Sequence, residues 1–138
     1  MSERAIRSLI VVNEFIVALD LQWTLDHLGV EVCGLARDAK TGLKMASELS
    51  PDVVLIDLYF DLQGIELAKD LRDACFMPVI FVGGYISGRI AAQIEQEIPG
   101  APVLQRPVSS QELAQAIERA TAVTAKRPAS RQGRFGPH

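Results

Sequence analysis

Asp57 is the residue whose type and position point most directly to chemistry. It follows residues 53–56, four apolar residues typical of a buried strand, so it stands at the carboxyl end of that strand. A carboxylate at the rim of a sheet, partly removed from water, can act as a nucleophile towards a phosphoryl group and form an acyl phosphate. The same position suits a helix-capping or solvated loop aspartate, so Asp57 alone leaves both interpretations open.

Polar residues and glycines follow the other apolar segments of β type in the same way. They are Asn13 and Glu14 after residues 8–12, Gly83 and Gly84 after residues 79–82, and Arg106 after residues 103–105. In parallel sheets ligands bind at the carboxyl ends of the strands, beside the point where the strand order reverses. These residues, with Asp57, are therefore the candidate site residues.

The alternation of two hydrophobic periods predicts the elements that position these residues. Strands are predicted at residues 8–12, 31–35, 53–56, 79–82 and 103–105, and helices at 14–28, 39–49, 64–74 and 86–98, with a last helix after a capping box at Ser109 and Glu112. Apolar strands joined by amphipathic helices favour an α/β fold with a parallel sheet covered on both faces. The chain length suits a doubly wound five-stranded sheet of order 2-1-3-4-5 with five helices.

The composition is that of one globular domain. The chain has 138 residues, of which 49% are hydrophobic and 22% charged, and this excludes a disordered chain. The net charge of −3 argues against nucleic-acid binding by the whole domain. We expect residues 1–124 to form the domain and residues 125–138, rich in Ala, Pro, Ser, Gly and Arg, to form a disordered basic tail.

Cysteine use and hydropathy suggest a reducing cytoplasm as the location. Cys33 and Cys75 lack metal-site or redox-motif spacing and are expected to be buried small hydrophobic residues. No apolar segment has the length of a membrane span, and the N-terminus lacks a signal-peptide core. We therefore expect a cytoplasmic protein with no membrane partner.

Four blocks of the sequence resemble the receiver domains of bacterial two-component response regulators, of the single-domain chemotaxis type. The blocks are LIVVNEF at 9–15, PDVVLID at 51–57, PVIFVGGY at 78–85 and LQRP at 104–107. The third block is similar to a subgroup whose fourth strand ends Phe-Ala-Thr-Gly-Tyr. The order and spacing of the blocks across residues 7–122 carry the resemblance, which implies a flavodoxin-like fold.

The resemblance also implies a role for each candidate site residue. In such receivers the aspartate after the third strand accepts a phosphoryl group from a kinase histidine, and Asp57 matches it. Mg²⁺ is held by that aspartate, an acidic pair after the first strand and a backbone carbonyl two residues beyond the aspartate. Asn13, Glu14 and Tyr59 stand at those positions.

The sequence departs from the receiver pattern at most supporting positions. Asn13 stands where a carboxylate is expected, so Mg²⁺ binding should be weakened. Gly83 replaces the Thr or Ser that binds phosphoryl oxygens, and Arg106 replaces the lysine. We expect Arg106 to pair bidentately with Asp57 and to hold the site shut. Val103 occupies the place of the aromatic switch residue.

The first predicted helix has two apolar faces. The expected core face is Phe15, Ala18, Leu21, Leu25 and Leu28. A second stripe holds Ile16, Leu19 and Trp23; Ile16 and Leu19 are expected to widen the core face, and Trp23 to be an exposed contact residue. The resemblance implies that this helix docks a histidine kinase or a histidine phosphotransfer protein.

Tyr85 and Ile86 are expected to start the fourth helix. The resemblance implies that this helix forms a dimer and output surface. Tyr85 is expected to be half-buried; a switch role in place of Val103 is the alternative.

Two signalling functions fit these residues. In the first, a stand-alone receiver without an output domain accepts a phosphoryl group on Asp57 and signals by contacts with a downstream protein or as a homodimer. In the second, a pseudo-receiver binds partners without phosphorylation. A small flavodoxin-like enzyme or flavin carrier is the remaining alternative, although residues 13–15 are not the Ser/Thr/Gly-rich phosphate loop that it needs. We expect the protein not to be an enzyme.

Overall fold

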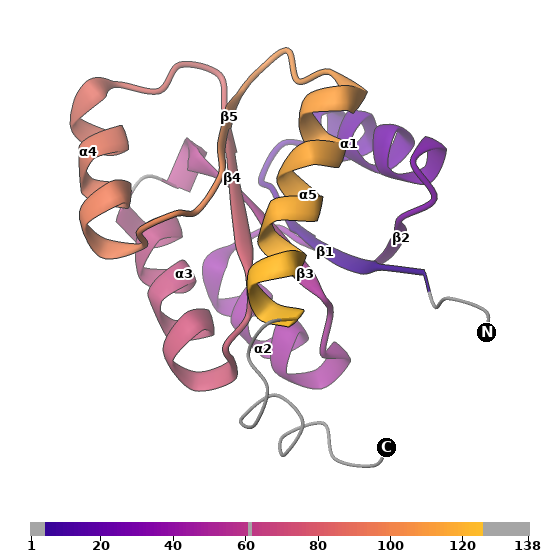
Figure 1. The fold of residues 1–138 in the computed structure, drawn as a ribbon, viewed down its shortest axis with the longest axis horizontal. Helices are drawn as coiled ribbons and strands as arrows, with labels where there is room; N and C mark the ends of the chain where they lie inside the picture. The colour runs from indigo at the N-terminus through magenta and orange to yellow at the C-terminus, as the bar shows by residue number, and fades with distance from the viewer. Residues whose placement is uncertain (1–4, 61, 126–138) are drawn as a thin grey trace.

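The computed structural model describes residues 5–60 and 62–125, which form alternating strands and helices (Figure 1). The strands are β1 (Arg7–Val11), β2 (Glu31–Ala36), β3 (Val53–Asp57), β4 (Val79–Gly83) and β5 (Val103–Gln105). The α-helices are α1 (Phe15–His27), α2 (Ala39–Leu49), α3 (Leu62–Cys75), α4 (Gly88–Glu97) and α5 (Ser110–Ala125), and a short 3-10 helix, η1 (Leu58–Phe60), follows β3. The predicted alternation is confirmed.

The strands form one parallel sheet of order β2-β1-β3-β4-β5, as predicted. In the register of the central strands, Asp57 lies beside Val82, and Gly83 lies beside Gln105. All strands run in the same direction, so their carboxyl ends meet at one edge of the sheet. The strand order reverses between β1 and β3, and the candidate residues follow these ends.

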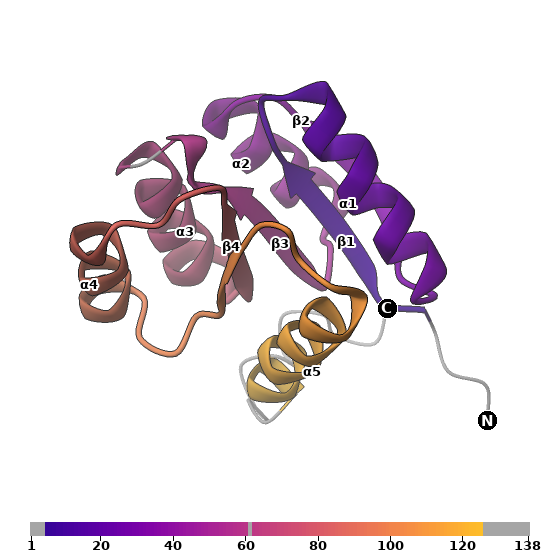
Figure 2. The same ribbon diagram turned by 90° about the horizontal axis from the view of Figure 1, so that it is seen from above.

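Helices cover both faces of the sheet, as Figure 2 shows: α1 and α5 lie on one face and α2, α3 and α4 on the other. Each layer of helices closes over its own hydrophobic cluster. Alternate residues of the strands point to opposite faces, so Leu9 and Val11 belong to one cluster and Ile10 and Val12 to the other. The doubly wound α/β architecture is therefore the predicted one.

Side-chain caps determine where several helices begin. The predicted capping box is present: the N–H of Ser109 donates to the Glu112 carboxylate, and the N–H of Glu112 donates to the Ser109 hydroxyl, each at 3.0 Å. Ser87 caps α4 by accepting from the N–H of Ile90. Since this cap fixes the start of α4 at Gly88, the prediction that Tyr85 and Ile86 start the helix is wrong; both lie in the preceding loop.

The apolar residues of α1 do not all face the core. Ala18, Leu21 and Leu25 are buried. Phe15, Ile16, Leu19 and Trp23 are exposed, so the core placements predicted for Phe15, Ile16 and Leu19 are wrong. A helix turns once in about 3.6 residues, which places positions 16, 19 and 23 on the side opposite 18, 21 and 25. The sheet contacts only the side of α1 that holds Ala18, Leu21 and Leu25. Phe15 is the first residue of the helix and is not among the residues that this contact buries.

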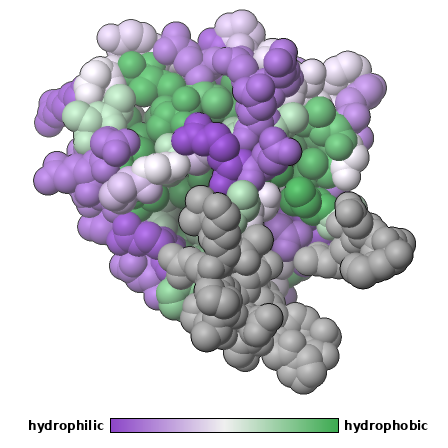
Figure 3. All heavy atoms as spheres, viewed as in Figure 1, coloured by the Kyte–Doolittle hydropathy of each residue, from purple (hydrophilic) through white to green (hydrophobic). Residues whose placement is uncertain are grey.

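Other predictions concern the surface and the ends of the chain. Cys33 and Cys75 are partly buried, so full burial, as predicted, is not found. Hydrophobic patches reach the surface between hydrophilic side chains on the face shown in Figure 3. Within residues 5–60 and 62–125 no helix has the length and apolar character needed to cross a membrane. The predicted basic tail lies, except for Ala125 at the end of α5, outside the described residues.

Candidate functional site at the carboxyl edge of the sheet

Asp57 ends β3 and is almost completely buried, with 1% of its surface exposed. The chain turns directly into η1, which brings the N–H of Tyr59 to within 3.0 Å of Oδ1 of Asp57. The second carboxylate oxygen, Oδ2, accepts no hydrogen bond. A carboxylate oxygen buried without a partner is energetically costly, so the fold holds one unsatisfied acceptor at the edge of the sheet.

The surroundings of Asp57 act in opposite directions on its pKa. Burial raises the pKa above its ordinary value of 3.8, and this is the largest effect. The Tyr59 N–H and the charge of Arg106 lower the pKa, because both favour the ionised form. The nearby carboxylate of Glu14 raises it by repulsion. The net result is a raised pKa.

Arg106 supplies the positive charge at this site. A terminal guanidinium nitrogen, Nη1, lies 3.9 Å from Oδ2 of Asp57, and Nη1 is also buried without a hydrogen-bond partner. The distance exceeds that of a hydrogen bond, so the predicted bidentate pair is wrong. Only Nη1 comes near the carboxylate, while Nη2 lies beside Gly84, so the guanidinium does not present two N–H donors to the two oxygens. The backbone N–H of Arg106 donates to the carbonyl of Gly83 at 2.7 Å.

The two glycines after β4 shape the space around this pair. A Cβ atom at Gly84 would lie 3.1 Å from Nη2 of Arg106, so the missing side chain leaves room for the guanidinium. A Cβ atom at Gly83 would lie 3.3 Å from side-chain atoms of Leu58 and Ile86. Gly83 therefore provides no hydroxyl group, and apolar side chains occupy the volume beside it.

The residues at the implied Mg²⁺ site do not fit that ion well. Asn13 is half-buried, and Glu14 is exposed at the start of α1, where its side chain caps nothing. Nowhere in the described part of the chain do three or more His, Cys, Asp or Glu side chains gather so that they could hold a metal. Mg²⁺ requires several hard, mostly anionic oxygen ligands. Asp57 and Glu14 offer two carboxylates, and the guanidinium of Arg106 lies beside the oxygen that a metal would need.

The second apolar stripe of α1 and the loop residue Tyr85 are exposed. Ile16, Leu19 and Trp23 are exposed together on α1. Trp23 contacts the ring of His27, with ring centroids 3.9 Å apart. Tyr85 is 83% exposed, so its predicted half-burial is wrong: the loop before α4 carries it away from the core.

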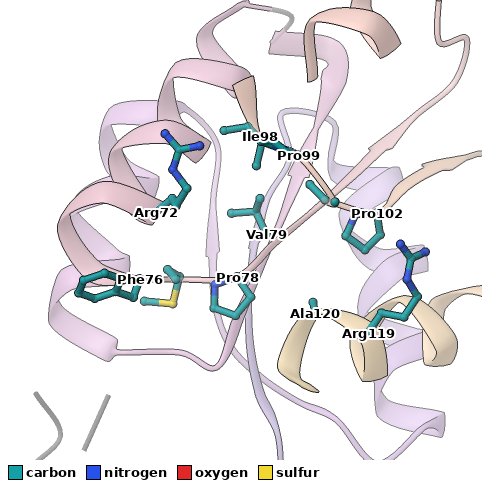
Figure 4. Close-up of a pocket in the computed structure, with 12 residues that line it drawn as sticks. Arg72, Phe76, Pro78, Val79, Ile98, Pro99, Pro102, Arg119 and Ala120 are labelled. Carbon is teal, nitrogen blue, oxygen red and sulfur yellow. The ribbon is translucent and has the colours of Figure 1, made fainter. Parts of the chain in front are cut away.

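Sequence patterns did not identify every feature of possible functional interest. Leu58 and Ile86 pack against Gly83, and neither belongs to a motif. A pocket of about 170 Å³ lies at the other end of the strands, where Pro78 precedes β4 and Pro102 precedes β5 (Figure 4). Arg72 and Arg119 lie at its rim (Figure 4). The pocket is built from the amino ends of the strands, so it is not part of the Asp57 site.

Curated relatives of this chain are response regulators, although no family model matches it. The phyllosphere-induced regulator PhyR of Methylorubrum extorquens is 32% identical over 87 residues, which are 61% of this chain and 33% of PhyR. The transcriptional regulatory protein PdtaR of Mycobacterium tuberculosis is 26% identical over 113 residues, which are 81% of this chain and 55% of PdtaR. The chain thus spans about a third to a half of these relatives.

Solved structures similar to this one are receiver domains covered almost from end to end. The signal receiver domain of a modulated diguanylate cyclase from Desulfovibrio desulfuricans has a TM-score of 0.79 and 27% identity, over 88% of this chain and 98% of that one. The response regulator domain of Thermotoga maritima CheB has a TM-score of 0.72 and 28% identity, over 86% and 98%. With the parallel sheet and the aspartate that ends β3, these likenesses show that the chain is similar in sequence and fold to the receiver domains of two-component response regulators.

Proposed function

We propose that this receiver accepts a phosphoryl group on Oδ2 of Asp57 from the histidine of a kinase or phosphotransfer protein. Oδ2 attacks phosphorus, the O–P bond forms, and the N–P bond to the donor imidazole breaks. The electron pair of that bond returns to the imidazole nitrogen, which takes up a proton. The product is an acyl phosphate on Asp57.

The observation that carries this proposal is the unsatisfied oxygen of Asp57. A buried carboxylate oxygen without a partner reduces stability by roughly 1–3 kcal/mol or more, and an apolar residue at the end of β3 would avoid that loss. Among the described residues, the hydrogen bond to its side chain comes from the adjacent turn, and its ion pair with Arg106 includes no hydrogen bond. Such a group is better explained by reactivity than by structure.

Arg106 supports the same role. Its Nη1 is 3.9 Å from the attacking oxygen and has no hydrogen-bond partner among the described residues. A phosphoryl group on Oδ2 would add three acceptor oxygens next to this unused donor. The guanidinium would then stabilise charge that develops during transfer.

A pseudo-receiver is the second candidate, and specific observations favour it. Leu58 and Ile86 fill the space beside Gly83 where receivers carry a hydroxyl, and Asp57 is 1% exposed. A phosphodonor therefore reaches Asp57 only if the edge of the sheet opens. In this alternative the domain binds partners without covalent change.

Both candidates require a protein-contact surface, for which we propose the exposed apolar residues of α1. Ile16 and Trp23 are 73% and 62% exposed, and large apolar side chains exposed together on a helix indicate a binding site. The docked protein in this proposal is a cytoplasmic histidine kinase or phosphotransfer protein. A homodimer or a downstream protein would use the same kind of contact.

Intact-mass measurement tests the phosphoacceptor directly. The full chain is incubated with phosphoramidate or with a cognate kinase and ATP, beside an Asp57→Asn control. We expect the mass of one phosphoryl group on the wild type and none on Asp57→Asn. Asp73→Asn, on an exposed aspartate of α3, is the matched control and should label like the wild type. Absence of label on the wild type with both donors would support the pseudo-receiver.

A further inference from the structure

We infer that the guanidinium of Arg106 takes the place of a divalent cation at this site, so that Asp57 is neutralised and phosphorylated without Mg²⁺. The phosphorylation part of this inference rests on the proposed function. The metal part concerns the charge on Asp57 alone and stands independently of any phosphoryl transfer.

The first argument is the position of the positive charge. Nη1 of Arg106 faces Oδ2, the one oxygen of Asp57 without a hydrogen bond, and both atoms are buried. A cation bound to Oδ2 would lie next to the guanidinium of Arg106. Because Oδ2 and Nη1 are both buried, bulk water would not screen the two positive charges from each other. Two positive charges at such short range in a partly dry site repel each other strongly. The arginine therefore occupies the electrostatic position of the metal.

The second argument is that the fold holds the arginine there. The backbone N–H of Arg106 donates to the carbonyl of Gly83, so the residue is fixed at the end of β4. Gly84 leaves the space that Nη2 fills, since any Cβ there would lie 3.1 Å from that nitrogen. The guanidinium can approach Asp57 because the carbonyl of Gly83 fixes the Arg106 backbone and Gly84 has no side chain in its way.

The third argument is the shortage of ligands. Within the described ranges, Asp57 has one nearby carboxylate, that of Glu14, which raises the pKa of Asp57. Asn13, which follows β1, offers a neutral oxygen in place of an anionic one. The positive charge of Arg106 offsets one of the two carboxylates, Asp57 and Glu14, and leaves a single net negative charge. That charge attracts a divalent ion only weakly, and the ion must also shed water in order to bind.

Arginine can also serve the product. Guanidinium binds phosphate through two parallel N–H donors, whereas an ammonium group offers a single point charge. In Arg106, Nη1 lies beside Oδ2 of Asp57, and Nη2 lies beside Gly84. One side chain thus neutralises the carboxylate before transfer and binds the phosphoryl oxygens after it.

Thermal unfolding of the full chain with and without millimolar MgCl₂, at constant ionic strength, tests the metal part. A ligand that binds only the folded state raises Tm, and we expect a change below about 1 °C for the wild type. Asn13→Asp combined with Arg106→Gln, which restores a carboxylate and removes the guanidinium, should show a Mg²⁺-dependent rise of several degrees. A Mg²⁺-dependent rise in the wild type that Asp57→Asn abolishes would overturn the inference.

Labelling by phosphoramidate in EDTA and in Mg²⁺ tests the phosphorylation part. We expect equal rates in both buffers for the wild type and for Arg89→Gln, an exposed arginine of α4 that serves as the control. Arg106→Gln should lose about a hundredfold in rate. Labelling of the wild type only in Mg²⁺ overturns the inference but leaves the proposed function intact. If neither phosphoramidate nor the cognate kinase with ATP labels the wild type, the proposed function fails, and the unfolding measurement still decides whether Arg106 replaces the metal.

Discussion

Oδ2 of Asp57 and Nη1 of Arg106 lie 3.9 Å apart, and neither atom has a hydrogen-bond partner. The pair is thus held by charge attraction without the hydrogen bonds that usually accompany buried ions. A pair of this kind adds little net stability, because desolvation offsets most of the attraction. Removal of Arg106 alone has a much larger effect, since it leaves the buried charge of Asp57 uncompensated.

This asymmetry predicts a rescue in a double-mutant cycle. Arg106→Gln should lower the free energy of unfolding by about 1–3 kcal/mol, because Asp57 is then buried without a counter-charge. Asp57→Asn should have little effect, since Arg106 is partly exposed and can be hydrated. The double variant should regain most of the stability lost by Arg106→Gln. Urea unfolding measures all three, with Arg89→Gln as the control; additive losses would contradict the coupling.

The raised pKa of Asp57 predicts a pH dependence of stability. Burial raises this pKa in the folded state above the ordinary value of 3.8, so the folded protein binds the proton more tightly than the unfolded chain does. Protonation therefore stabilises the fold, and that stabilisation disappears as the pH rises through the folded-state pKa. The stability of the wild type relative to Asp57→Asn should fall as the pH rises above about 4, measured by urea unfolding. A difference that rises with pH would refute the assigned direction.

The sequence predicts the fold well because the strands and helices repeat one pattern. Buried runs such as residues 53–56 and amphipathic helices such as residues 39–49 admit few other arrangements. The prediction misses the start of α4, because the Ser87 cap outweighs the apolar character of Ile86. It also misplaces Ile16, because α1 is apolar on both sides and only the position of the sheet decides which side is buried.

The candidate site is predicted in its residue types but only partly in its geometry. Asp57 and Arg106 come together as expected, since strand order alone brings their ends to one edge. The bidentate pairing fails because Nη2 of Arg106 lies beside Gly84 and only Nη1 comes near the carboxylate, an orientation that no sequence motif encodes. The apolar filling beside Gly83 by Leu58 depends on packing, which no local motif encodes.

Gly84→Ala tests the space that the guanidinium needs. Its Cβ would lie 3.1 Å from Nη2 of Arg106, so the guanidinium would have to shift by a few tenths of an ångström from its position beside Asp57. We expect a loss of about 1 kcal/mol in the free energy of unfolding, and no loss in an Asp57→Asn background. Gly88→Ala is the matched control, because nothing lies within 4 Å of a Cβ there. An equal loss in both backgrounds would show that the effect is unrelated to Asp57.

Gly83→Ser tests whether a missing hydroxyl limits phosphorylation. Gly83→Ala is the comparison, because both variants bring the same Cβ to 3.3 Å from side-chain atoms of Leu58 and Ile86. Both should lose about 1–3 kcal/mol of stability from crowding. The serine variant should label about tenfold faster than the alanine variant, because its hydroxyl can donate to a phosphoryl oxygen. The labelling rates are measured by intact mass. Equal rates for the two variants would exclude the hydroxyl as the missing group.

Trp23→Ala tests the contact surface on α1. The side chain is 62% exposed and contacts His27, so its loss should change the free energy of unfolding by less than about 1 kcal/mol. Leu25→Ala, on the buried side of the same helix, should lose about 2–5 kcal/mol. If Trp23 is a central contact, binding to the kinase or self-association should weaken about 30-fold, because a residue of this type contributes about 2 kcal/mol or more.

Titration calorimetry with the cognate kinase and sedimentation of the free protein measure the two kinds of binding. Glu48→Ala, an exposed change on α2, which covers the opposite face of the sheet from α1, should leave both unchanged. Unaltered kinase affinity together with unaltered sedimentation of Trp23→Ala would remove α1 as the contact surface. A loss confined to one of the two measurements would identify the occupant, because the kinase and a second copy of the chain are then distinguished by the same substitution.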